Sequence, residues 1–208
     1  PADAQAVLVE THRCARQAED DEVLVRAATL VGIASTDQVH LDRAETVLRA
    51  AVSGGEGLNA RRAVIASLVA LARCLFWRGR YDDADRILTP IDPIGLTEED
   101  TVRVGVERSR IAVGRNDLAA AVSGIASAAA AADRAGHQQL VALSAYAAAF
   151  VHLSLGDAVA VTKDVVRCVT AAHLAHDPLL SLRARLLGAE SERRLGRRRR
   201  AAMLVSRV

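Results

Sequence analysis

The sequence predicts an all-α protein built as a stack of antiparallel helical hairpins, on three observations. Its 208 residues are rich in Ala, Val and Leu, with 4 prolines and 2 % aromatic residues, so helix formers dominate and strand-like runs are missing. Apolar residues recur at spacings of three and four, as in Val64, Leu68, Leu71 and Leu75. A short turn that usually contains glycine recurs along the chain.

The clearest hairpin lies within residues 71–88. Gly79 can adopt the left-handed conformation that ends a helix. Asp82 and Asp83 follow, where the positive end of a new helix favours carboxylates. Ala84 is small enough to let this second helix approach the first closely. The segment therefore predicts two packed helices joined by a tight turn.

Start and stop signals divide the rest of the chain in the same way. Pro90 and Pro93 end a helix because proline cannot continue one, whereas Thr97 can cap the next and Pro178 suits a first turn. The expected helices cover about residues 2–19, 20–35, 37–51, 59–78, 80–88, 97–114, 116–135, 137–155, 157–175 and 178–195, with a last one beginning after Gly196.

The recurring turn defines a repeat of the form G-x-x-x-x-A. Copies beginning at Gly79, Gly114, Gly156 and Gly196 align without a gap, at separations of 35, 42 and 40 residues, and residues 39–44 resemble a copy without the glycine. A single amphipathic hairpin cannot cover its own apolar face, so neighbouring hairpins must stack. The period predicts a helical solenoid.

This turn after a Leu/Ala-rich helix resembles the tetratricopeptide repeat. The consensus Leu-Gly pair of the first helix corresponds to Leu71-Ala72 in the best copy and to Leu187-Gly188 in the last. The resemblance covers residues 1–208 as a single solenoid and is clearest over 59–208. It implies a right-handed superhelical stack of about five hairpins with a preceding helix.

The stretch 131–157 is similar to the long repeats of large bacterial ATP-dependent transcription activators. These include LuxR-type regulators related to the maltose-regulon activator and some sigma-54-dependent activators. The resemblance implies a non-catalytic regulatory module that senses a small effector or protein segment, while other domains hydrolyse ATP and bind DNA. Because the chain lacks an initial Met and ends within a helix, we expect a fragment of a longer protein. The alternative is a tetratricopeptide adaptor that scaffolds a protein complex.

The repeat pattern also implies which side chains line the concave groove. Guanidinium groups beside aromatic rings could hold a peptide carboxylate, a sugar-like ligand or an aromatic ligand. The alternative is that the rings pack between helices and the arginines are solvated or ion-paired. The implied groove residues are Arg73, Trp77, Arg108, Tyr146, Phe150, Arg183, Glu190 and Arg194.

Catalytic and metal sites are not expected. Cys14, Cys74 and Cys168 are widely spaced without a CxxC motif, which predicts reduced core thiols in a cytoplasmic protein. His173 and His176 lack an obvious third metal ligand. The sequence contains no phosphate-binding loop, no nucleophile motif and no uninterrupted apolar run long enough to span a membrane. We therefore expect no enzyme activity, cofactor, metal or membrane partner.

A basic cluster lies between Arg193 and Arg200. It supplies six of the 27 basic residues, and without it 21 basic residues oppose 25 acidic ones. The cluster could bind nucleic acid or an acidic partner, could pair with Glu190 and Glu192, or could be neutralised by other parts of a longer protein. We do not expect nucleic-acid binding through this fragment, because it has no recognition motif or stacking platform.

Overall fold

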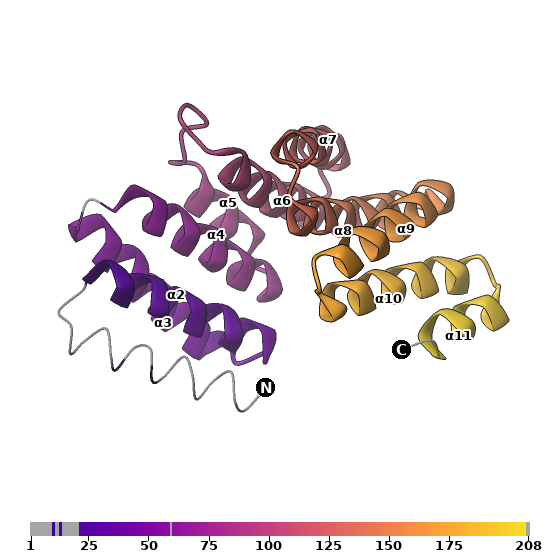
Figure 1. Cartoon of the computed structure of the whole chain (residues 1–208), viewed down its shortest axis with the longest axis horizontal. Helices are drawn as coiled ribbons and strands as arrows, with labels where there is room; N and C mark the ends of the chain where they lie inside the picture. Colours follow the sequence, from indigo (N-terminus) through magenta and orange to yellow (C-terminus); the bar gives the residue numbers. More distant parts are fainter. Residues whose placement is uncertain (1–9, 11–12, 14–20, 59, 207–208) are drawn as a thin grey trace. The chain divides into compact units, whose positions relative to one another are not determined.

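The computed structural model describes Glu10, Arg13 and residues 21–58 and 60–206 (Figure 1). The fold is all-α, as predicted: these residues form ten helices, α2 to α11, and no strand. Most of the helix expected over residues 2–19 lies outside the described residues. The chain divides into two compact units, residues 1–92 and 93–208, and each is described by itself.

Unit 1 contains two hairpins. The first is formed by α2 (Asp21–Asp37) and α3 (Leu41–Gly57), and the second by α4 (Arg61–Trp77) and the short α5 (Tyr81–Leu88). Helix α4 packs against both α2 and α3. Helix α5 ends just before Pro90, as expected.

Unit 2 contains three hairpins. They are formed by α6 (Glu98–Gly114) with α7 (Leu118–Ala135), α8 (Gln138–Leu155) with α9 (Ala158–Leu174), and α10 (Pro178–Arg194) with α11 (Arg198–Ser206). Helix α8 also packs against α6 and α10, so the first helices of the three hairpins form one layer. The prediction of about five hairpins is confirmed for the described residues, whereas the single superhelix over the whole chain stays a prediction.

A residue with positive φ lies in the turn after most helices. In unit 2 the positive-φ residues that follow α6 to α10 are spaced at intervals of 20, and in unit 1 Val39 and Gly79 are twice that interval apart. The predicted turns at Gly79, Gly156 and Gly196 are confirmed, but the turn after α6 is centred on Asn116, and Gly114 is the last residue of that helix. The alignment at Gly114 was therefore wrong by two residues. The unit 2 series is Asn116, Gly136, Gly156, His176 and Gly196.

Val39 is the strained member of this set. Its φ is 63° and its side chain is 75 % exposed, so a β-branched residue adopts a left-handed conformation without burial in return.

We expect Val39→Asn to raise the free energy of unfolding by about 1 kcal/mol, because asparagine tolerates the left-handed region better. The reciprocal Asn116→Val, at φ 60°, should lower it by a similar amount. Thermal unfolding followed by circular dichroism measures both. Equal melting temperatures for Val39→Asn and the parent chain would contradict this account.

Small buried residues set the distance between the helices of a hairpin. In the first helix of each hairpin, a small residue stands seven positions before the positive-φ residue of the turn that joins the two helices. These residues are Gly32, Ala72, Ser109, Ala149 and Ala189, and all five are buried. The structural equivalent of Leu71-Ala72 in the last hairpin is therefore Gly188-Ala189, and the predicted pair Leu187-Gly188 was one residue out of register. Ala84 is fully buried, as its predicted role requires.

Gly32 shows how close this approach is. A Cβ atom added there would lie 2.4 Å from Cγ of Leu48, whose side chain is fully buried. Gly57, the last residue of α3, is a control position because nothing lies within 4 Å of a Cβ atom added there.

We expect Gly32→Ala to destabilise unit 1 by about 1–3 kcal/mol, because Leu48 has no free space into which it can move. Gly57→Ala should be neutral or stabilising by up to about 1 kcal/mol. Denaturant unfolding followed by the fluorescence of Trp77, the single tryptophan, reports on unit 1. A Gly32→Ala variant as stable as Gly57→Ala would contradict close packing at this position.

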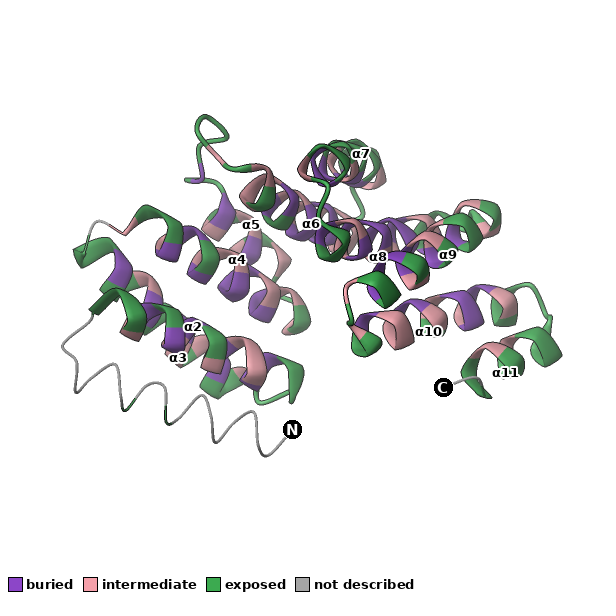
Figure 2. Cartoon of the chain, in the orientation of Figure 1, coloured by how far each residue is buried: buried purple, intermediate pink, exposed green. Residues whose placement is uncertain are grey.

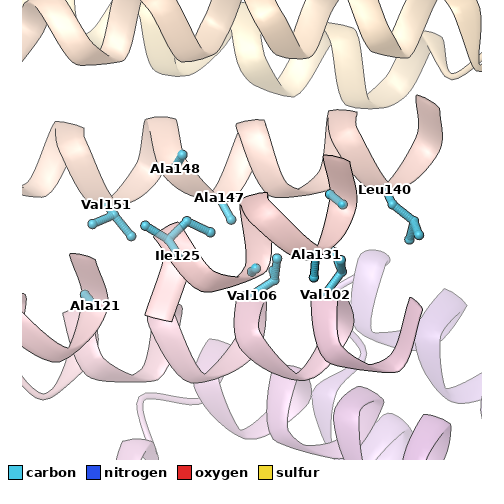
Figure 3. Close-up of a cluster of buried hydrophobic side chains, with 11 residues drawn as sticks. Val102, Val106, Ala121, Ile125, Ala131, Leu140, Ala147, Ala148 and Val151 are labelled. Carbon is cyan, nitrogen blue, oxygen red and sulfur yellow. The ribbon is translucent and has the colours of Figure 1, made fainter. Parts of the chain in front are cut away.

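A hydrophobic core lies between α6, α7 and α8. Figure 3 shows side chains of all three helices pointing toward one another, with Val106, Ile125 and Ala147 near the middle. Helix α8 is buried along much of its length (Figure 2). It is the one described helix long and apolar enough to cross a membrane, yet half of it is buried among its neighbours, as in a core helix.

Candidate functional site

The predicted groove residues are divided between the two units. Arg73 and Trp77 lie on α4 in unit 1, and the other six lie in unit 2 on the layer formed by α6, α8 and α10. The structure therefore brings residues together within each unit, and the two groups are considered separately.

In unit 1, Arg73 joins two hairpins. Its Nη2 atom donates a hydrogen bond of 2.6 Å to Oδ1 of Asp37, at the end of α2. Nearby in sequence, Trp77 is 58 % exposed and meets the ring of Phe76 edge-on, with ring centroids 5.5 Å apart. Arg73 is thus ion-paired, as the alternative interpretation of the groove arginines anticipates, whereas Trp77 leaves a large apolar surface open to solvent.

In unit 2, the corrected turn register identifies Arg110 in place of Arg108. On α4, α6, α8 and α10, one residue lies six positions before the left-handed residue of the following turn. These residues are Arg73, Arg110, Phe150 and Glu190. Arg108 is two residues from Arg110, about 200° around the helix, and is half-buried. Sequence reasoning missed Arg110 because it took Gly114 as the turn. The Asn-Asp pair at 116–117, with Asp117 capping α7, was the signal that could have found it.

Arg110 is held from two sides. Its guanidinium carbon lies 5.3 Å from the centre of the Tyr146 ring on α8, a cation–π arrangement. Its Nη1 atom donates a hydrogen bond of 2.7 Å to Oε1 of Glu107, and the two side chains are only 10 % and 6 % exposed. Phe150 lies one helical turn beyond Tyr146 on the same face and is half-buried.

Glu190 and Arg194 continue this face on α10. Arg194 donates one hydrogen bond to Glu190 and another, of 3.0 Å, to the backbone carbonyl of Leu153 on α8. Arg193 pairs with the same carboxylate. Arg183 lies seven residues before Glu190 and so on the same side of the helix. We call Arg110, Tyr146, Phe150, Arg183, Glu190 and Arg194 the first-helix face.

Hydrogen bonds from Arg193 and Arg194 lower the pKa of Glu190 to about 2. Because the folded state favours the ionised carboxylate, these pairs favour folding above pH 4.5 and lose that effect as the pH falls through about 2.

We expect the side-chain carboxyl carbon of Glu190 to titrate near pH 2 in an NMR experiment. In the double variant Arg193→Ala/Arg194→Ala its midpoint should move up toward 4.5, because both hydrogen-bond donors are gone. The side-chain hydrogen bond from Arg134 of α7 lowers the pKa of Glu98, and the titration of Glu98 should be the same in the parent chain and the double variant. A parent-chain midpoint near 4.5 would show that the three side chains do not pair in solution.

A cavity of about 950 Å³ lies between the end of α9 and the start of α10. Its walls combine leucines with His173, His176 and Arg185. Two of the leucines, Leu174 and Leu179, are 59 % and 51 % exposed. Sequence reasoning weighed the two histidines as metal ligands and as favourable residues at a helix C-terminus, and did not find the cavity. The leucines on both sides of the break at residues 176–178 are the sequence feature that could have indicated the cavity.

The two cysteines of the described residues are buried. Cys74 and Cys168 are fully buried core residues, as predicted, while Cys14 lies outside the described residues. Burial raises the pKa of the Cys168 thiol to about 12 and also raises that of Cys74, so both are protonated at neutral pH. No group of three or more His, Cys, Asp or Glu side chains in the described part of the chain could hold a metal ion.

No protein-family profile matches the chain, and no curated protein matches its sequence. The fold of the described residues is an all-helical, repeat-like array of consecutive hairpins.

Proposed function

We propose that the chain is a non-catalytic binding module, the regulatory repeat domain of a bacterial multidomain transcription regulator. It would bind a protein segment or a small effector on the first-helix face of unit 2. The observation that carries this proposal is the stacking of Arg110 on Tyr146, beside Phe150. Its partners would include the other domains of the same cytoplasmic protein, with no cofactor and no membrane.

The first-helix face is rigid before a ligand arrives. Glu107 fixes the guanidinium group of Arg110, which covers Tyr146, while Arg194 ties α10 to α8. A ligand would therefore bind with little loss of side-chain entropy, which favours affinity. The rings suit stacking with an aromatic or sugar ring, and a ligand carboxylate could exchange with Glu190 on Arg194.

The packing of the helices also supports a binding role. Repeat arrays of hairpins present extended surfaces without the converging polar groups that catalysis needs. In the described residues the buried thiols are protonated, Arg110 pairs with Glu107, and Arg194 pairs with Glu190.

Fluorine NMR can test the binding face because each unit contains one tyrosine. In a chain labelled with 3-fluorotyrosine, Tyr146 reports on the first-helix face and Tyr81, on α5, is an internal control. We expect titration with an acetylated peptide ending in phenylalanine, or with a linear glucose trisaccharide, to shift the Tyr146 signal and leave the Tyr81 signal in place.

The matched variant is Phe150→Leu, which keeps an apolar side chain but removes the ring. We expect it to weaken binding about three- to tenfold, because it removes ring stacking. If neither probe moves the Tyr146 signal, binding of these two ligand classes at the face is refuted. The regulator assignment is tested separately: an open reading frame that encodes neither an ATPase nor a helix-turn-helix would contradict it and favour an adaptor.

A further inference from the structure

The arginine cluster at 193–200 has two parts in the structure. Arg193 and Arg194 pair with Glu190, and Nη1 of Arg197 lies 3.6 Å from Oε1 of Glu192. The remaining three, Arg198 to Arg200, are the first residues of α11 and are exposed. No carboxylate of the described residues forms an ion pair with them, so internal pairing explains only half of the cluster.

These three arginines oppose the dipole of their own helix. Cations at a helix N-terminus are unfavourable, because the aligned peptide dipoles place partial positive charge there. Most of α11 is exposed (Figure 2), so an external anion could reach them. The first turn of α11 thus carries a positive charge that nothing in the described part of the chain neutralises.

An apolar pocket lies beside the first turn of α11, at Arg200. It has a volume of about 320 Å³ and is formed by α9, α10 and α11, with Arg200 on its wall. Val166 and Met203 line it and are 61 % and 52 % exposed. Gly188 lies in the same wall, where an added Cβ would approach Val165 and Leu204 to about 3.5 Å. The pocket is at the lower end of the size range of ligand sites.

We propose that this surface, the α11 patch, binds an acidic peptide segment that carries one bulky aliphatic side chain. The aliphatic side chain enters the pocket between Val166 and Met203, and flanking carboxylates pair with Arg198 to Arg200. The carboxylates of such a peptide complement the positive charge of the three arginines. Among the residues that line the pocket, only Glu192 carries a carboxylate, and its Oε1 atom lies 3.6 Å from Nη1 of Arg197. This inference goes beyond the proposed function, because it uses none of the first-helix face.

A peptide suits the α11 patch better than a nucleic acid does. The pocket is lined by aliphatic side chains, and none of the five aromatic residues of the chain lies on α9, α10 or α11, so bases have no ring to stack on. The Oε2 atom of Glu192 is buried without a hydrogen-bond partner. The negative charge of this carboxylate, in the wall of the pocket, would repel a phosphate group that entered the pocket.

Fluorescence anisotropy with defined probes tests the proposal. The probe is a fluorescein-labelled peptide with a central leucine flanked by glutamates. Two matched peptides replace the glutamates by glutamine or the leucine by alanine, and a single-stranded oligothymidylate tests nucleic acid. We expect the glutamate–leucine peptide to bind most tightly, with an affinity that falls as salt is added.

Two variants separate charge from pocket. Arg198→Glu/Arg199→Glu/Arg200→Glu should weaken binding about tenfold or more and flatten its salt dependence. Acids in a first turn also favour the helix, so α11 should remain folded. Val166→Ser/Met203→Ser should weaken binding while keeping the salt dependence, since it alters only the apolar contact.

Matched controls exist for both variants. Arg26→Glu/Arg43→Glu/Arg62→Glu makes the same charge change at exposed sites of unit 1, and Val159→Ser alters an apolar residue of α9, 68 % exposed, outside the pocket. Both should bind the peptide like the parent chain. Equal binding of the glutamate and glutamine peptides, an equal loss in the unit 1 control, or tighter binding of oligothymidylate would each overturn the proposal.

Discussion

The close approach of helix backbones at small residues is the constraint on which both units depend. A Cβ on Gly32 would meet Leu48, and one on Gly124 would lie 2.7 Å from Oγ of Ser109. With so few aromatic residues, the chain cannot fill wide spaces between helices, so it brings the helices together. The distance between helices therefore follows from where glycine, alanine and serine stand.

The left-handed turn residue decides which side chains reach that interface. Glycine is easy to recognise as such a residue, and the turns at Gly79 and Gly156 were predicted correctly. The turn at Asn116 was not, because a glycine two residues earlier offered a competing position, although asparagine also tolerates positive φ. That shift of two residues turned attention from Arg110 to Arg108. A local ambiguity in turn chemistry thus shifted the expected register of α6 by two residues.

The sequence located the layer of first helices but not the partners of its side chains. Asp37 lies 36 residues before Arg73, and the carbonyl that accepts from Arg194 lies 41 residues before it. Such pairs depend on the exact stacking of neighbouring hairpins, which periodicity alone does not fix. The same reason explains why the cavity beside His173 was missed, since its walls come from two helices joined by an irregular break.

The constant interval of 20 residues between turns makes the chain sensitive to changes in its length. One residue added inside a helix of unit 2 would rotate every later residue of that helix by about 100° and move buried positions to the surface. The interval from Gly79 to Asn116 is 37 residues, not 40, and it includes the segment 89–97 between α5 and α6. Length can vary in this segment without disturbing the register of either unit. Insertions and deletions that preserve the fold should accumulate there during evolution.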